Sequence, residues 1–331
     1  MASERRDVAV VVATFRRSDL LERCLAALCA QTLDGHRYEI VIADDDAGNP
    51  GAATTLAQVD AWRVRTGGAP AIRYVPVTRT QGPAGARNAG WRAADARVIA
   101  FTDDDTVPDP HWLEAGLAYL ATGFDAAGGA IEMPLPPRPT DYERDAAGLS
   151  RAEFATANCL VVRSALADVG GFDERFTSAW REDSDLHFSL MASGYRVGHA
   201  ADALVVHPIR PAPFGVSVPQ QKKSAFEALL FKKHRDLYRT RIAASAPWGY
   251  YGSVASLLVA AGAALSGAPT VAVGALCVWA VLTLRFARRR LRGTSRSLRH
   301  VAEMLWTSIV IPPLSIWWRL VGAFRYRVVF F

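Results

Sequence analysis

A stretch of 43 residues without one charged side chain, between Arg241 and Arg285, restricts the fold of this chain more than any other feature. About 20 apolar residues cross a bilayer as an α-helix, so the stretch has room for two passes. Pro269 lies near its middle, where a turn must join two helices. A helix of a soluble protein nearly always has a polar face, and neither half of this stretch has one. We therefore expect apolar helices at 248–266 and 269–284 that cross the membrane or enter it as a shallow re-entrant hairpin.

Positive charge flanks this stretch on both sides. Residues 242–331 contain ten arginines and one acidic residue, Glu303, a net charge of +9, whereas the whole chain carries +6. Cytoplasmic loops of membrane proteins are enriched in Lys and Arg, so both ends of the hairpin are expected on the cytoplasmic side of the inner (plasma) membrane. A nucleic-acid-binding protein would spread its positive charge over the folded domain. We therefore expect membrane lipids as partners and no nucleic acid.

Two further segments of the C-terminal part are predicted to lie at the membrane surface. Residues 224–241 place Phe and Leu among Lys and Arg, the pattern of a cationic amphipathic helix attracted to anionic lipid. Residues 304–318 form a third apolar run that contains two adjacent prolines and several tryptophans, so an interfacial helix is expected in preference to a third crossing. The expected domains are a folded domain at 1–221, a basic amphipathic linker at 222–247, the apolar hairpin at 248–286 and a basic segment with an interfacial or third transmembrane helix at 287–331.

The N-terminal part alternates short apolar runs with amphipathic ones. Buried strands are predicted at 8–13, 39–43, 72–76 and 97–102, with helices between them. Alternating strands and helices predict an α/β fold with a mostly parallel sheet and helices on both faces, followed here by an all-α membrane-associated region. In such sheets, ligands bind beyond the carboxyl ends of the strands.

Three consecutive aspartates follow two of these strands. One triplet occupies residues 44–46, and the other is Asp103, Asp104 and Asp105. A single aspartate after a strand is usually a helix cap or a turn residue, but that explanation suits two triplets at equivalent strand ends poorly. Clustered carboxylates repel one another unless a cation lies among them, and oxygen ligands select hard ions such as Mg²⁺ or Mn²⁺. We therefore expect a divalent cation at this edge of the sheet.

Seven segments between Val8 and His207 resemble, in order, the motifs of glycosyltransferase family 2, whose members have the GT-A (Rossmann-like) fold and use sugar-nucleotide donors. The first is similar to the family's opening strand and nucleotide loop, although Ala13 and Arg16 stand where Pro and Asn are usual. Any one of these segments is a weak signal, and the resemblance depends on their order. They are VVATFR at 11–16, IADD at 42–45, GPAGARNAG at 82–90, DDD at 103–105, GGFDERF at 170–176, WREDSDL at 180–186 and VVH at 205–207.

The resemblance implies roles for individual residues. It implies that Asp105 and His207 bind Mn²⁺ or Mg²⁺ and that Asp183 is the general base for the acceptor hydroxyl. One base and direct displacement invert the anomeric configuration. Asp45 corresponds to the residue that accepts the N–H of a uracil-type base, which favours a UDP- or dTDP-sugar. The residues expected to contact the nucleotide-sugar are Thr14, Asp45, Arg87, Asn88, Asp103, Asp104 and Glu182.

The expected function is therefore that of a metal-dependent inverting glycosyltransferase acting on a lipid-linked or cell-envelope glycan. A processive polysaccharide synthase would carry a QxxRW segment after the ED motif, and residues 220–224 read QQKKS. A sugar nucleotidyltransferase would have a glycine-rich loop after its first strand, and residues 14–17 read TFRR. A non-catalytic sugar-nucleotide-binding membrane scaffold is the remaining alternative, although it would not need Asp105, Asp183 and His207 together.

Overall fold

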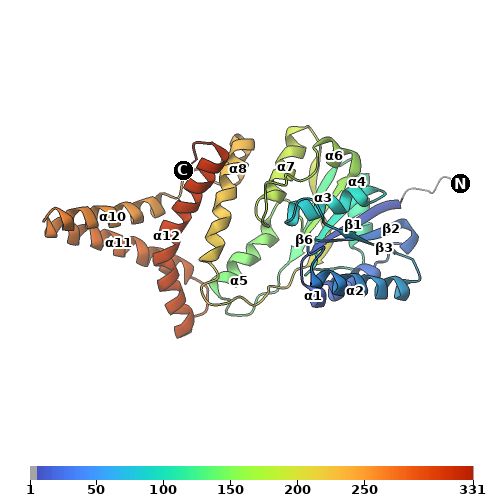
Figure 1. Ribbon diagram of the computed structural model, residues 1–331, viewed down its shortest axis with the longest axis horizontal. Helices are drawn as coiled ribbons and strands as arrows, with labels where there is room; N and C mark the ends of the chain where they lie inside the picture. The colour runs from blue at the N-terminus through green and yellow to red at the C-terminus, as the bar shows by residue number, and fades with distance from the viewer. Residues whose placement is uncertain (1–5, 331) are drawn as a thin grey trace. The chain divides into compact units, whose positions relative to one another are not determined.

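The computed structural model describes residues 6–330, which belong to two compact units (Figure 1). The first, here called the α/β unit, comprises Met1–Pro134 and Gly148–Pro208. The second, here called the helical unit, comprises Leu135–Ala147 and Ile209–Phe331. The catalytic motifs recognised in the sequence all lie in the α/β unit, and the apolar stretch lies in the helical unit.

The α/β unit is built on an eight-stranded sheet in the order β3-β2-β1-β4-β7-β6-β8-β5. The first four strands of this order pair in parallel, as do β6 and β8, whereas β7 runs antiparallel to β4 and β6, and β5 runs antiparallel to β8. The predicted α/β sheet is confirmed, with β7 as a reversed strand that the apolar pattern did not reveal. The strands are β1 (Arg6–Thr14), β2 (Tyr38–Asp44), β3 (Ala71–Pro76), β4 (Ala96–Asp103), β5 (Val107–Pro108), β6 (Ala126–Glu132), β7 (Asn158–Val162) and β8 (Val197–Val206).

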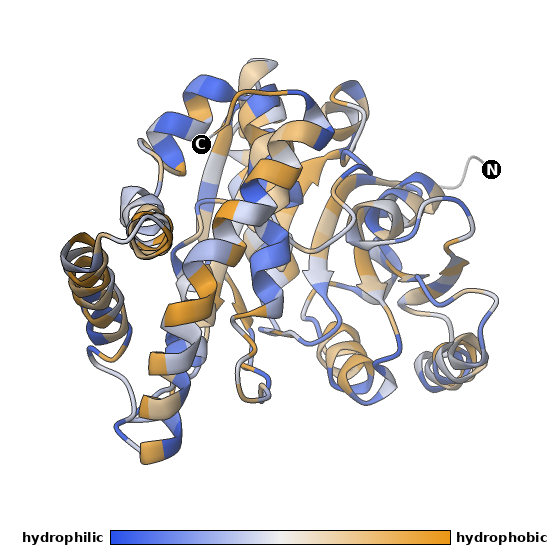
Figure 2. Ribbon diagram, turned by 60° about the vertical axis from the view of Figure 1, so that its left-hand side comes forward, coloured by the Kyte–Doolittle hydropathy of each residue, from blue (hydrophilic) through white to orange (hydrophobic). Residues whose placement is uncertain are grey.

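Helices cover both faces of this sheet. Alternate residues of a strand point to opposite faces, so Val10 of β1 packs with Leu21 and Leu25 of α1 on one face, and Val11 packs with Trp91 of α3 on the other. Figure 2 shows the strands coloured mainly hydrophobic and the surrounding loops mainly hydrophilic. The α-helices of this unit are α1 (Ser18–Cys29), α2 (Pro50–Thr66), α3 (Pro83–Ala93), α4 (Trp112–Ala121), α6 (Arg163–Asp168) and α7 (Glu182–Ala192), with 3-10 helices η1 (Gly35–Arg37) and η2 (Ala147–Arg151).

Among residues 209–330 of the helical unit, three helices are long and apolar enough to cross a membrane, namely α10, α11 and α12. Two of them correspond to the predicted hairpin, and the turn between them contains Gly267, whose positive φ of 73° suits a glycine. The helices are α5 (Asp141–Ala146), α8 (Ala225–Lys233), α9 (Arg235–Arg241), α10 (Trp248–Leu265), α11 (Pro269–Arg290) and α12 (Leu298–Tyr326), with the 3-10 helix η3 (Pro219–Ser224).

The structure differs from one local expectation for this unit. Residues 224–241 do not form one amphipathic helix, because the chain breaks at His234 and residues 225–231 of α8 are all buried. α8 packs against α12 at Gly322, where an added side chain would collide with the Ala225 backbone, so tertiary packing overrides the amphipathic pattern. The third apolar run is the middle of the 29-residue helix α12, which continues through Pro312 and Pro313.

Candidate active site

Two carboxylates and one imidazole gather at the carboxyl edge of the sheet. Asp103 ends β4, Asp105 lies in the turn after it, and His207 directly follows β8. One ligand atom from each residue can be chosen so that all three lie within 4.8 Å of one another, and Nε2 of His207 is 3.5 Å from Oδ1 of Asp105. The structure thus brings together the two predicted metal ligands, Asp105 and His207. It adds Asp103, which we expected to face the nucleotide-sugar.

Asp104, the middle residue of the triplet, is bound by the protein itself. Its Oδ2 accepts a hydrogen bond of 2.8 Å from Oγ1 of Thr14, and its Oδ1 accepts one of 3.1 Å from Nη1 of Arg17. Burial raises the pKa of Asp104 to about 6, and the nearby Arg17 and Thr14 oppose that rise. Thr14 and Asp104, both expected to contact the donor, therefore contact each other. Arg17 was not among the predicted site residues. The sequence does show it directly after the nucleotide-loop segment that ends at Arg16, which could have indicated a role in the site.

Arg87 of α3 joins the aspartate triplet to the ED motif. Nη2 of this buried guanidinium donates to Oδ1 of Asp103 at 2.8 Å, and Nη1 donates to Oε1 of Glu182 at 3.0 Å. Burial alone would raise the pKa of Asp103, but the charges of Arg87 and His207 hold it below its usual value. Burial raises the pKa of Glu182 to about 7 despite the contact with Arg87. One guanidinium therefore connects two segments that are far apart in the sequence, and both belong to one site.

Asp183, the expected general base, lies in the first turn of α7. Its Oδ1 accepts hydrogen bonds from the backbone N (2.6 Å) and Oγ (3.3 Å) of Ser184. Burial raises the pKa of Asp183 above its usual value, although Ser184 and the charges of Arg181 and Arg87 oppose this. Glu182, the residue before Asp183, accepts a hydrogen bond from Arg87, and the same guanidinium donates to Asp103 of the aspartate triplet.

Asn88 has a structural role in this arrangement. Its Nδ2 donates to the Phe172 carbonyl and to Oε1 of Glu174, and its Oδ1 accepts from Nε1 of Trp91 and the Phe172 backbone N. The side chain is fully buried, so all of its hydrogen-bonding groups are taken up by protein partners. Gly171 has a positive φ of 77°, and a side chain there would meet Oδ1 of Asn88 at 2.6 Å. Asn88 thus fixes the GGFDERF segment and has no group left for a nucleotide.

Asp45 has one carboxylate oxygen that lacks a partner. Its Oδ2 accepts a hydrogen bond of 2.8 Å from the Gly82 backbone N, whereas Oδ1 is buried and has no hydrogen-bond partner among the described residues. A cleft of about 620 Å³ is lined by the neighbouring residue Ala47 and by residues 77–81 and Thr177. A buried acceptor without a donor is rare in native structures, so this oxygen is a natural partner for an N–H group of a bound ligand.

Comparisons with known proteins identify the family of this chain. The model of "Glycosyl transferase family 2" matches residues 9–161, and that of "Glycosyl transferase family group 2" matches residues 141–320, which is more than half of the chain. The chain belongs to glycosyltransferase family 2. It is a glycosyltransferase, with an α/β GT-A domain and a helical region that is compatible with membrane association.

Several individual proteins are similar to this chain. Glycosyltransferase AglE of Haloferax volcanii is 28% identical over 233 residues, which cover 67% of this chain and 72% of that protein. Pre-mycofactocin glycosyltransferase of Mycobacterium tuberculosis is 29% identical over 223 residues, 62% of this chain and 43% of that protein. A mannosyltransferase from Pyrobaculum calidifontis, solved with GDP-Man and Mn²⁺, superimposes with a TM-score of 0.60 at 18% identity, covering 95% of this chain and 88% of that one. This last likeness confirms the GT-A fold.

Proposed function

We propose that the protein is a metal-dependent, inverting glycosyltransferase that works at the cytoplasmic face of the inner membrane. It moves a hexosyl or deoxyhexosyl group from a nucleoside-diphosphate sugar to a hydroxyl of a lipid-linked or cell-envelope glycan. The observation that carries this proposal is the Arg87 bridge, because it holds the aspartate triplet and the segment of Asp183 in one site. A scaffold that only binds the donor would have no need for this connection.

The residues at the strand ends fit a divalent cation. Asp103, Asp105 and His207 offer two carboxylates and one imidazole within 4.8 Å, and carboxylate oxygens are the ligands that suit Mn²⁺ or Mg²⁺. A divalent ion bound there would act as a Lewis acid that neutralises the charge of the departing diphosphate. The Mn²⁺ in the Pyrobaculum mannosyltransferase makes Mn²⁺ the first ion to test. The pairing of Arg87 with Asp103 leaves Asp105 and His207 as the principal ligands.

Asp183 receives the proton of the acceptor hydroxyl. Its raised pKa makes the carboxylate a better proton acceptor, and the hydrogen bonds from Ser184 fix one of its oxygens. Arg87 keeps Glu182 in place beside it, so Arg87 and Glu182 are positioning residues. A single base and attack opposite the leaving diphosphate invert the anomeric centre.

Asp45 selects the nucleotide-sugar donor by accepting a hydrogen bond from an N–H group of the nucleotide base. The unpaired Oδ1 accepts one hydrogen bond. We favour UDP- or dTDP-sugars, since the N3–H of uracil or thymine suits a single acceptor. Guanine also offers an N–H, and the Pyrobaculum neighbour binds GDP-Man, so GDP-sugars belong in the same donor screen.

The membrane contact in this proposal is the α10–α11 hairpin, and α12 is a helix that does not cross the membrane. In the most apolar 18-residue segment of each helix, 22% of α10 and 17% of α11 is buried by the rest of the protein, whereas 44% of α12 is buried. The C-terminal end of α12 packs on α8, where Nζ of Lys232 donates to the Tyr326 carbonyl at 2.8 Å. A crossing α12 would draw the lysines of α8 toward the hydrocarbon, which is costly. The test is labelling of a Val329→Cys variant with an impermeant maleimide in a Cys29→Ser/Cys277→Ser background. We expect labelling from the cytoplasmic side, and labelling from the opposite side contradicts this topology.

The full-length protein in lipid nanodiscs tests the reaction. We would incubate it with Mn²⁺, a panel of UDP-, dTDP- and GDP-sugars and a membrane lipid extract, and identify products by mass. The expected result is release of nucleoside diphosphate together with a lipid or glycan product that is one sugar heavier. Donor binding without transfer for any donor would favour the non-catalytic scaffold.

A further inference from the structure

We propose that the outer face of α11, at its C-terminal end, is a binding site for an anionic phospholipid. Arg285, Arg288, Arg289 and Arg292 contact the headgroup phosphate, and the apolar residues one turn earlier contact an acyl chain. This inference rests on the proposed insertion of the α10–α11 hairpin into a membrane. It goes further, because it assigns a lipid class to one defined surface.

The site is a continuous stripe along one helix face. A cleft of about 590 Å³ is lined by six residues of α11 and the turn after it. Their spacing follows the i, i+3, i+4, i+7, i+8, i+11 pattern that brings side chains to one side of an α-helix. All six are exposed. They are Val281, Leu284, Arg285, Arg288, Arg289 and Arg292.

Arg290 lies on the opposite face of the same segment, and its charge is paired within the protein. It is buried, its Nε donates to Oδ2 of Asp141 at 2.9 Å, and its Nη1 donates to Oγ1 of Thr307 at 2.6 Å. None of the four outward arginines forms a salt bridge with any residue in the described range 6–330. The protein thus compensates the inward charge and leaves the outward charges for an external partner.

The arrangement of charge and apolar surface selects the partner. Like charges at i+3 and i+4 repel one another, so four arginines on one face are stabilised by an anion between them. Val281 and Leu284, 64% and 58% exposed, continue the same stripe into the apolar part of the helix. A soluble anion would use only the arginines. A phospholipid, which carries a phosphate next to acyl chains, matches both parts of the cleft, and basic pockets at the cytoplasmic ends of membrane helices recognise such headgroups.

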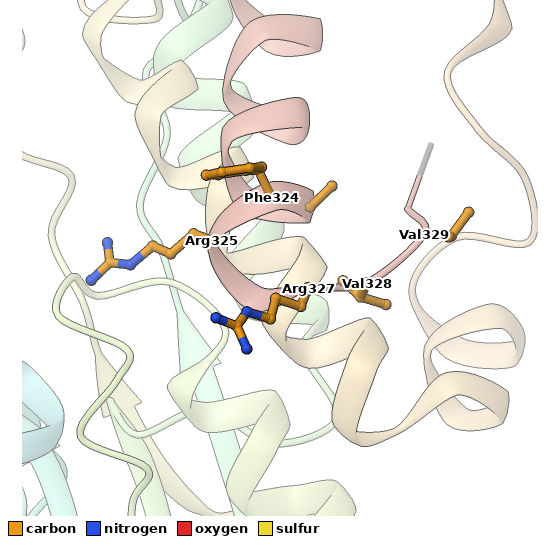
Figure 3. Close-up of a pocket in the computed structure, with 6 residues that line it drawn as sticks. Phe324, Arg325, Arg327, Val328 and Val329 are labelled. Carbon is orange, nitrogen blue, oxygen red and sulfur yellow. The ribbon is translucent and has the colours of Figure 1, made fainter.

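A second cleft offers a matched control. It has a volume of about 520 Å³ and lies at the C-terminal end of α12, where Figure 3 shows Arg325 and Arg327 extending away from Val329. It contains two arginines, and Arg327 lies after the end of the helix, so it has no helical stripe of cations. Removing these two charges changes the net charge of the protein as much as removing two from α11.

The experiment measures the binding of phosphatidylglycerol and phosphatidylcholine to the full chain in detergent by native mass spectrometry. For R288Q/R292Q we expect a loss of phosphatidylglycerol affinity of about 30-fold, since each basic residue near an anionic lipid surface contributes about 1 kcal/mol, a factor of about five. R325Q/R327Q should bind as the wild type does, and R288K/R292K should retain more affinity than the Gln variant because it keeps the charges.

Three results would overturn the proposal. They are equal phosphatidylglycerol binding by R288Q/R292Q and the wild type, equal losses in R288Q/R292Q and R325Q/R327Q, and binding of soluble glycerol 3-phosphate as tight as that of phosphatidylglycerol, which would indicate a site for free anions. Sedimentation with membranes separates this proposal from the one on which it rests. R288Q/R292Q should still sediment with membranes, whereas failure of the wild type to sediment would contradict hairpin insertion itself.

Discussion

Arg87 in the α/β unit and Arg290 in the helical unit are both buried and both paired with carboxylates, yet they are used differently. Arg87 bridges Asp103 and Glu182, two carboxylates of the active site. Arg290 contacts one carboxylate, Asp141, and hydroxyl groups of other segments of the helical unit. The carboxylates at the sheet edge outnumber the arginines that pair with them, so this region would be stabilised by a bound cation. The arginines on the surface near Arg290 outnumber the nearby carboxylates, so that region would be stabilised by a bound anion.

The largest effect is expected in the active site of the α/β unit, on turnover. Asp183→Asn removes the proton acceptor, so turnover should fall by a factor of about 10² to 10⁴. Mn²⁺-dependent donor binding and the melting temperature should stay near their wild-type values. Product formation in a donor–acceptor assay measures the turnover, and calorimetry measures the donor binding and the melting temperature. Asp202→Asn, a change at an exposed aspartate, is the control, and turnover by Asp183→Asn at the control's rate would refute the assignment.

Removing the two buried arginines compares the two regions directly. Arg87→Met leaves the buried carboxylate of Glu182 without its cation, a loss of about 3–5 kcal/mol for a buried pair. Arg290→Met leaves Asp141, which is more exposed than Glu182 and can be rehydrated, so a smaller loss is expected. Thermal unfolding checks the order of the two variants, and Arg87→Met/Glu182→Gln should recover part of the loss. The reverse order of melting temperatures would show that the Arg87 bridge is not the more tightly buried pair.

His207→Ala should weaken Mn²⁺ binding by about tenfold or more, since even indirect partners of a metal site contribute this much. The bound ion can be counted by electron paramagnetic resonance without reference to activity. His199→Ala, which changes an exposed histidine of β8, should leave the affinity unchanged. Equal Mn²⁺ affinity in His207→Ala and the wild type would remove His207 from the site.

The smallest effect concerns pH. Burial raises the pKa of Asp183, and its ionised form accepts the proton, so kcat/KM should fall as the pH drops through a pKa above the usual aspartate value of about 3.9. The pH profile of kcat/KM, measured with Mn²⁺ held saturating, reports this acid limb. An acid limb at the ordinary aspartate value would contradict the burial of the base.

The sequence predicted the parts of the fold that depend on local patterns. Residues of β1, β2 and β4 are buried on both faces, so their apolar runs were unmistakable, and the triplet at the end of β4 located the cluster with Asp105 and His207. Contacts between distant segments could not be read in the same way. The pairing of Thr14 with Asp104 and the enclosure of Asn88 arise only when the chain is folded. The burial of α8 depends on Gly322, which lies almost a hundred residues later.

The central claim is that the cation-binding residues and Asp183 belong to one active site, and a magnetic measurement tests it most directly. A nitroxide is attached to Asp183→Cys, or to Asp60→Cys on the exposed side of α2 as control, in a Cys29→Ser/Cys277→Ser background. The account predicts that Mn²⁺ strongly broadens the nitroxide spectrum at position 183, much less at position 60, and that EDTA reverses the effect. Equal broadening at the two positions, or none at position 183, would contradict it.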